Sequence, residues 1–186
     1  QGIHVPMPIV TPDPETMSDL TDAERDSLAA MQFYQNHDSG YSKQQSTRPQ
    51  TLGYGLADSP MGQAAWILEK FYQWMDCDGL PQNIVSLDEL LDNVMLYWLP
   101  NAGASSARIY WESFGSSTLS SLPVTVPSAI SIFPKEIFKT SERWARLRYQ
   151  DLRYFNELPK GGHFAAFEQP DLFVQELRTA FDQMRD

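Results

Sequence analysis

Apolar residues recur at helical spacing through most of the first half of the chain. Apolar side chains three or four positions apart form one stripe along a helix, and that stripe faces a core. The spacing predicts helices over residues 21–37, 59–75, 86–98 and 105–114. The segment 38–56 contains three glycines and a proline and has no sustained period. It is predicted to be a loop with at most one helical turn.

The second half of the chain changes to short apolar runs. Residues 129–133 and 152–155 are typical of buried strands, with helical residues around Trp144 between them and a last helix that begins near Pro170. Residues 2–7 predict the end of another buried strand. Strand–helix–strand units favour parallel sheets, whose sites lie at the carboxyl ends of the strands.

The expected fold class is therefore α/β, with a helical block inserted before the last strand-helix-strand-helix. The predicted division is residues 1–10 as the end of a core strand, 11–120 as a helical domain and 121–186 as α/β core. Two or three parallel strands cannot cover both faces of their own sheet. A further part of the core is therefore expected from elsewhere.

Composition and charge exclude several classes of protein. The formal net charge is −10, which is the wrong sign for a nucleic-acid groove or an anionic membrane surface. The apolar runs are too short to span a membrane, and the chain opens without an export signal, so we expect a cytoplasmic protein. The single cysteine, Cys77, excludes an intramolecular disulfide or a multi-cysteine zinc site. We expect neither a metal nor an organic cofactor.

His163 and Glu136 are the residues best placed for chemistry. His163 follows two glycines on a loop after a predicted strand, and Glu136 follows the preceding strand by three residues. An imidazole titrates near neutral pH and suits a general base, and a carboxylate beside it would fix its tautomer. Each residue alone also fits a structural role, as a loop histidine or as an acid at a helix start. Acid after one strand and histidine after the next is the order of the last two members of an α/β-hydrolase triad.

Longer motifs resemble the epoxide hydrolases of the microsomal type, within the α/β-hydrolase superfamily. Lys160 to Pro170 (KGGHFAAFEQP) is similar to that family's histidine loop, and Ser131 to Glu136 (SIFPKE) resembles its acid-bearing segment. The resemblance continues upstream through the motifs SGY from Ser39, RPQTLGYGL from Arg48, DSPMG from Asp58, DNVMLYW from Asp92 and SSARIY from Ser105.

The resemblance implies a role for each matching residue. His163 would activate water, and Glu136 would orient His163. Tyr41 and Tyr110 match the two lid tyrosines that donate hydrogen bonds to the epoxide oxygen. An aspartate would attack one ring carbon, and the resulting ester would be hydrolysed to a vicinal diol. Taken without the family, either tyrosine fits equally well as a packed aromatic residue.

The nucleophilic aspartate of that family has no counterpart in this sequence. No small-x-nucleophile-x-small turn occurs, so the chain is expected to be the carboxyl-terminal half of the fold and to be inactive alone. The expected partners are an epoxide, water and the missing amino-terminal half, with a second copy of the chain as an open alternative. Two other functions stay open: a haloalkane or haloacetate dehalogenase, and a non-catalytic half that acts by association.

Overall fold

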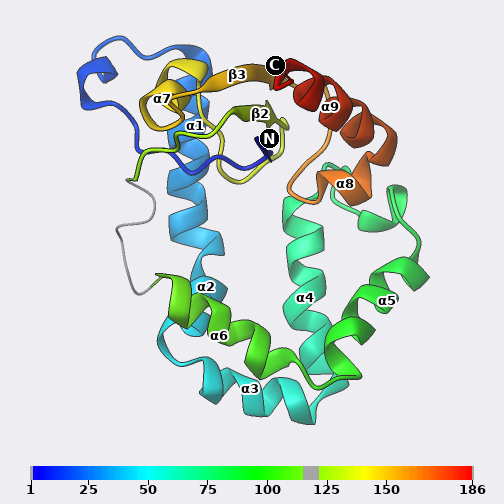
Figure 1. Ribbon diagram of the computed structural model, residues 1–186. Helices are drawn as coiled ribbons and strands as arrows, with labels where there is room; N and C mark the ends of the chain where they lie inside the picture. The colour runs from blue at the N-terminus through cyan, green and yellow to red at the C-terminus, as the bar shows by residue number, and fades with distance from the viewer. Residues whose placement is uncertain (1, 115–121, 186) are drawn as a thin grey trace. The chain divides into compact units, whose positions relative to one another are not determined.

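In the computed structural model, which describes residues 2–114 and 122–185, three strands form one parallel sheet in the order β1-β2-β3 (Figure 1). These strands are β1 (Ile3–Val5), β2 (Ser128–Ile132) and β3 (Leu152–Glu157). Ile3 lies opposite Ser128, and Ile130 lies opposite both Val5 and Phe155. The parallel sheet predicted from the sequence is confirmed.

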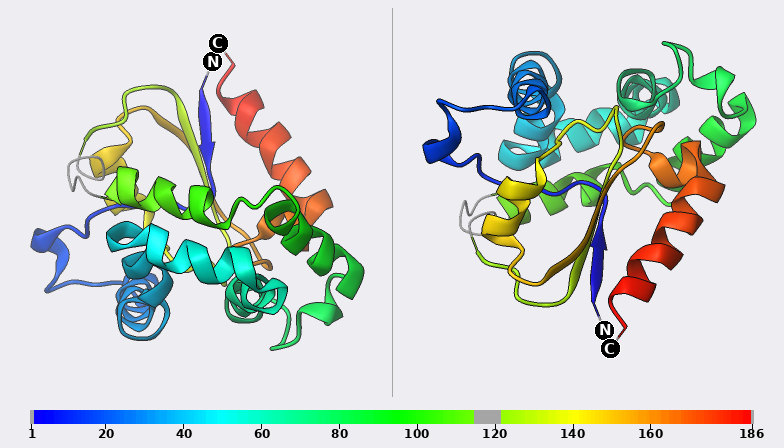
Figure 2. Two further views of the ribbon diagram at one scale, coloured as in Figure 1. Left: turned by 90° about the horizontal axis from the view of Figure 1, so that it is seen from below. Right: turned by 90° about the horizontal axis from the view of Figure 1, so that it is seen from above.

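Both faces of the sheet are covered, by α7 (Glu142–Arg148) and α9 (Pro170–Gln183), as Figure 2 shows. Ile130 and Ile132 point toward Ala145 and Tyr149 on the α7 side. Ala129, one position along, packs with Ala180 and Met184 on the α9 side. Every residue of β2 is buried, including Ser128 and Ser131, as expected for a strand of a parallel sheet that is covered on both faces.

β1 departs from the prediction of a buried strand. Ile3 is 39% exposed, and His4 and Val5 are half-buried. Among the described residues β1 pairs with β2 alone, so one of its edges carries no strand. Its exposure follows from that edge position.

The buried carboxylate of Glu176 bonds α9 to β2 and β3, and Ser131 links this cluster to β1. Glu176 accepts hydrogen bonds from the Ser131 hydroxyl at 2.8 Å, the Asn156 amide at 3.0 Å and the Tyr154 hydroxyl at 3.1 Å. The His4 ring lies 2.9 Å from the Ser131 oxygen. Burial and the Glu176 carboxylate raise the pKa of Tyr154, and burial lowers the pKa of His4.

The chain divides into two compact units. The sheet unit comprises Gln1–Tyr34 and Thr118–Asp186, and the helical unit comprises Gln35–Ser117. The first boundary therefore falls after Tyr34, where a boundary at residue 10 was expected. The difference arises because α1 (Asp22–Phe33) bonds to the sheet unit, for example through Ser27 and the Lys139 carbonyl at 2.7 Å. The second predicted boundary, at residue 120, lies outside the described residues.

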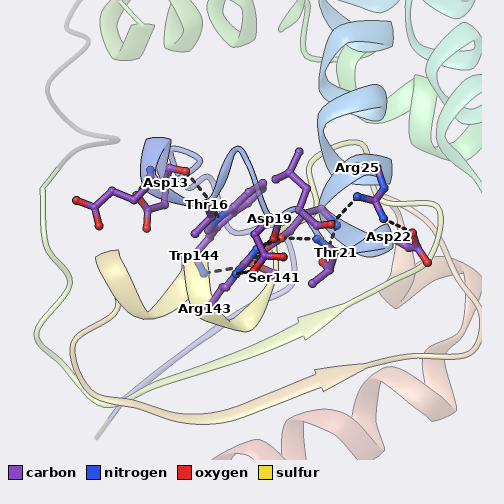
Figure 3. Close-up of polar contacts among 12 residues, drawn as sticks. Asp13, Thr16, Asp19, Thr21, Asp22, Arg25, Ser141, Arg143 and Trp144 are labelled. Atoms are coloured by element: carbon purple, nitrogen blue, oxygen red, sulfur yellow. Dashed lines mark hydrogen bonds and ion pairs between the residues drawn. The ribbon is translucent and has the colours of Figure 1, made fainter.

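Glu24 joins α1 to α7 through Ser141 and Arg143. Figure 3 shows the polar network around Thr21, Ser141 and Arg143. Its carboxylate is fully buried and accepts hydrogen bonds from Nε and Nη2 of Arg143 and from the Ser141 hydroxyl. It also accepts from the Thr21 amide in a capping box. Because Arg143 stabilises the charged form, the pKa of Glu24 falls to about 2.

We expect Glu24→Gln to remove a pH-dependent part of the free energy of unfolding. Because the pKa of Glu24 is depressed in the folded state, its contribution is complete above about pH 4.5 and is lost as the pH falls toward 2. The variant should lose about 1–3 kcal/mol at pH 7 and much less at pH 2, because it lacks this titration. Urea denaturation across that range measures the difference.

Glu142→Gln is the matched control, because Glu142 also bonds to an arginine of α7 but is exposed. Its stability should change by at most about 0.5 kcal/mol. An equal loss for Glu24→Gln at pH 7 and pH 2 would show that the ionised carboxylate is not the stabilising group.

The helical unit contains the helices predicted after residue 58 and two that were not predicted. A π-helical turn, Tyr34–Asp38, continues α1 across the boundary between the units. The helices that follow are α2 (Gly40–Thr47), α3 (Pro49–Asp58), α4 (Pro60–Trp74), α5 (Leu87–Trp98) and α6 (Gly103–Phe114). The short 3₁₀ turns are Pro14–Thr16 and Pro81–Asn83, and α8 (Ala165–Glu168) precedes α9.

The prediction of a loop at 38–56 is wrong, because α2 and α3 occupy it. Pro49 stands at the first turn of α3, where a proline needs no amide donor. At Gly53 a Cβ atom would lie 2.4 Å from the Cβ of Ala104, so this glycine permits the close approach of α3 to α6. The glycine that looked like a helix breaker is a packing site.

Several apolar stripes are less buried than the spacing predicts. In α5 Leu90 and Val94 are buried, but Leu87, Leu91 and Met95 are exposed. On α4 Phe71 and Trp74 are buried, and Met61 is 75% exposed. On α9 Glu176 and Ala180 are buried, whereas Val174 and Phe181 are exposed. In the described part of the chain, no helix has the length and apolar character needed to cross a membrane.

Candidate active site

Glu136 and His163 lie at the carboxyl edge of the sheet, as the strand order predicts. Glu136 follows β2, and His163 follows β3, its parallel neighbour. An isolated parallel bridge between Lys135 and Gly162 extends this pairing beyond both strands. The two loops therefore leave the sheet side by side, which brings an acid and a base together from positions 27 residues apart.

The two side chains form a short hydrogen bond. Nδ1 of His163 lies 2.7 Å from Oε1 of Glu136, whose side chain is 2% exposed. A carboxylate can only accept, so Nδ1 carries the proton and the lone pair of the neutral ring is on Nε2. The Ile137 amide also donates to Oε1, at 2.7 Å. Nε2 is therefore the nitrogen that can accept a proton from water, and the 23% exposure of the His163 side chain leaves the ring within reach of solvent.

Gly161 allows the loop to turn toward the Glu136 segment. Its φ is +109°, which is strained for any residue with a side chain, and a Cβ there would lie 2.7 Å from the Phe133 ring. The Gly161 carbonyl accepts from the Lys135 amide at 3.1 Å. A glycine is thus required at position 161, two residues before His163.

Glu168 contacts the histidine loop from the other side. Its Oε2 accepts from the Gly162 amide and its Oε1 from the Phe164 amide, both at 2.9 Å. Glu168 is buried and ends the single turn of α8. One carboxylate thus holds the amides on both sides of His163.

Tyr41 and Tyr110 also lie together, within the helical unit. Tyr41 is on α2 and Tyr110 on α6, and both are half-buried. Their ring centroids are 5.7 Å apart in an edge-to-face arrangement. The structure therefore brings the four predicted site residues together as two pairs, one in each unit.

The ammonium of Lys70 lies over the Tyr41 ring. Its Nζ is 4.8 Å from the Tyr41 centroid and 5.2 Å from the Trp74 centroid, a cation–π geometry. The Lys70 side chain is 12% exposed. A groove of about 560 Å³ adjoins these residues, and its lining includes His37, Asp38, Tyr41, Trp66, Glu69 and Lys70.

Glu168 and Lys70 are not among the site residues predicted from the sequence. A signal exists for Lys70, because residues 66, 70 and 74 lie on one helix face and place a lysine between two tryptophans. Glu168 stands four residues after Phe164, the N-cap of α8, a spacing that allows a side chain to reach back to the start of the helix. His4 contacts Ser131 and so belongs to the buried cluster around Glu176 described above, which we call the Glu176 cluster (His4, Ser131, Tyr154, Asn156 and Glu176).

The chain is similar to named epoxide hydrolases. It is 52% identical over 184 residues to a Stigmatella aurantiaca protein named "Putative epoxide hydrolase", covering 99% of this chain and 42% of that protein. It is 41% identical over 151 residues to epoxide hydrolase 1 of Sus scrofa, covering 76% of this chain and 33% of that protein. The chain thus spans less than half the length of these relatives. A search of family models found no match.

The fold is also that of epoxide hydrolases. The solved structure of an enantioselective mutant of epoxide hydrolase from Aspergillus niger matches 98% of this chain with a TM-score of 0.83 at 30% identity, covering 45% of the mutant's chain. The juvenile hormone epoxide hydrolase of Bombyx mori matches 95% of this chain with a TM-score of 0.77 at 32% identity, covering 42% of that structure. This chain therefore resembles epoxide hydrolases in sequence over less than half of their length, and it shares that part of their α/β-hydrolase fold.

Proposed function

We propose that the enzyme to which this chain belongs hydrolyses an epoxide to a vicinal diol. The observation that carries the proposal is the 2.7 Å bond between Nδ1 of His163 and Glu136, which leaves Nε2 as the proton acceptor. The names of the related proteins support the same reaction. In this proposal the pair formed by Tyr41 and Tyr110 serves the same substrate.

The reaction proceeds in two steps. A carboxylate attacks one carbon of the epoxide ring, the carbon–oxygen bond breaks, and its electron pair remains on the oxygen as a developing alkoxide. A phenol has an ordinary pKa near 10, so it is protonated at neutral pH and can donate to that oxygen. Tyr41 and Tyr110 are the proposed donors. The product of this step is an alkyl ester of the enzyme.

Water then cleaves the ester. Nε2 of His163 takes a proton from water as the water attacks the ester carbonyl, and Glu136 stabilises the imidazolium that forms. The imidazolium gives that proton to the alkoxide leaving group, and the proton of the carboxylic acid that forms passes to the oxygen of the opened ring, so that the diol, the free carboxylate and the neutral ring of His163 result. The positive charge on the imidazole of His163 develops next to the buried carboxylate of Glu136, and this is the electrostatic reason for pairing the two residues.

The attacking aspartate is proposed to come from a part of the enzyme outside this chain. Five aspartates of this chain lie in other settings: Asp58 ends α3, Asp88 and Asp92 are in α5, Asp76 follows α4, and Asp151 precedes β3. Asp151 also bonds to Arg153 at 3.1 Å. A nucleophile on a tight turn between a strand and a helix has no counterpart among them.

Replacing Tyr41 or Tyr110 by phenylalanine tests the proposed function in the complete enzyme. Each loss of a donor to the alkoxide should slow ring opening by about 10–100-fold, equivalent to about 1–3 kcal/mol. The ring stays in place, so folding should change little. Rapid-quench measurement of ester formation from an excess of enzyme over epoxide reports this step separately.

Tyr72→Phe is the control, because Tyr72 is an exposed tyrosine of the same helical unit. It should open the ring at the rate of the unaltered enzyme. Release of halide from a haloalkane, with no diol formed from epoxides and no effect of either tyrosine, would favour a dehalogenase. An enzyme inert toward both substrates would support the non-catalytic alternative.

A further inference from the structure

Glu168 is bonded to the protein backbone on both sides of His163. Its two carboxylate oxygens accept from the amides of Gly162 and Phe164, and both distances are 2.9 Å. The residue is 5% exposed. A buried carboxylate with two amide donors is a strong and directional contact, because charge-assisted hydrogen bonds are about twice as strong as neutral ones.

The loop before His163 cannot hold the ring in place by itself. Gly161 and Gly162 have no side chains, and glycine gives the backbone more conformational freedom than any other residue. The φ of Gly161 needs that freedom, as described above. The restraint must therefore come from contacts to neighbouring segments. Lys135 provides one such contact on the sheet side, and Glu168 provides two on the helix side.

We propose that Glu168 is a positioning residue for His163. It fixes the backbone at 162 and 164, and this sets where the imidazole lies between Glu136 and the ester. The inference rests on the proposed function, since the base it positions is the base of ester hydrolysis. Two carboxylates then hold one histidine, Glu136 through the ring and Glu168 through the main chain.

The chemistry of the contact requires a carboxylate. A glutamine at 168 has one carbonyl oxygen, so it can accept from one of the two amides. Its NH₂ group would face the other amide, which leaves two donors opposed and one backbone N–H unsatisfied in a buried place. Glu168→Gln therefore keeps the size of the side chain and removes one of its two hydrogen bonds to the backbone amides.

The decisive measurement in the complete enzyme separates the two chemical steps. Ring opening does not use His163, but ester hydrolysis does. Glu168→Gln should slow ester hydrolysis by about 10–100-fold, because small displacements of a reacting group cost rate steeply. Ester formation should stay within about twofold to threefold of the unaltered rate. The enzyme should therefore accumulate ester during turnover, which intact-protein mass spectrometry detects.

Glu24→Gln is the matched control for a structural role. Glu24 is a buried glutamate of the same unit that also accepts from a backbone amide, and it has no part in the proposed chemistry. It should lower stability without accumulation of ester. If Glu168→Gln slows both steps alike, or no more than Glu24→Gln does, the positioning role is wrong. If the glutamine variant does not fold, Glu168→Asp is measured by the same criteria.

A second readout does not depend on epoxide chemistry. The Nδ1 proton of His163, shared with Glu136, is expected at low field in the proton NMR spectrum of the unaltered enzyme. Glu168→Gln should broaden or remove that signal through faster exchange with water, and Glu24→Gln should leave it in place. An unchanged signal in Glu168→Gln overturns the inference. Absence of any covalent ester in unaltered and His163→Ala enzymes would instead overturn the proposed function and leave the NMR result to decide on Glu168.

Discussion

The His163→Ala enzyme is expected to take up one equivalent of epoxide and to release almost no diol. Attack on the epoxide ring does not use the imidazole, so the ester still forms. Its hydrolysis lacks the base that takes a proton from water, and general base catalysis contributes about 10²–10⁴-fold. Intact-protein mass spectrometry should show the protein mass increased by the mass of the whole epoxide, and steady-state assays should show turnover reduced by about that factor.

A histidine of the same unit provides the control. His4→Asn removes an imidazole that contacts Ser131 in the buried cluster and that takes no part in the proposed reaction. This variant should be less stable but should turn over epoxide and show no trapped ester. Continued diol production by His163→Ala at a rate near that of the unaltered enzyme would mean that another group is the base.

Glu136→Gln is expected to cause the second-largest loss. A glutamine can present its NH₂ group to Nδ1, which selects the tautomer with the lone pair on the wrong nitrogen. It also removes the negative charge that stabilises the imidazolium. The corresponding change in a Ser-His-Asp triad costs about 10⁴-fold, and a loss of about 10²–10³-fold in ester hydrolysis is expected here. Single-turnover assays should show ester formation at a normal rate followed by slow decay.

Glu157→Gln tests whether loss of any acid at this edge has the same effect. Glu157 is the last residue of β3, at the same end of the sheet, and it is exposed. Its replacement should leave both steps unchanged. If the ester decays at the same rate in Glu136→Gln and Glu157→Gln, the bond between Glu136 and His163 has no role in hydrolysis.

The acid and the base could be predicted from local signals. Glu136 and His163 follow adjacent strands, and parallel strands end at one edge, so their meeting follows from the pattern alone. The helix starts predicted at residues 21 and 86 agree with the capping boxes that Thr21 and Ser86 form, because a cap side chain reaches its own helix in any context.

Other features depend on partners far away in the sequence. Gly53 of α3 fits closely against Ala104 of α6, a contact that no local pattern contains. The first domain boundary lies after Tyr34, and not at residue 10, because α1 bonds to the sheet unit through contacts such as that between Glu24 and Arg143, which are 119 residues apart. The role of Glu168 was hidden for a different reason: its partners are backbone amides, which every sequence has and no motif displays.

The Glu176 cluster bears on how this sheet evolves and on how its strands find their register. A shift of β1 by one residue would turn His4 away from Ser131 and toward the opposite face, so the polar contact penalises the slipped alignment. Replacing Glu176 alone would take this acceptor from the buried Ser131 hydroxyl and from the half-buried Tyr154 and Asn156 donors, whereas exchanging the whole group for apolar residues of similar volume can be neutral. These positions are therefore expected to vary as a set among related sequences.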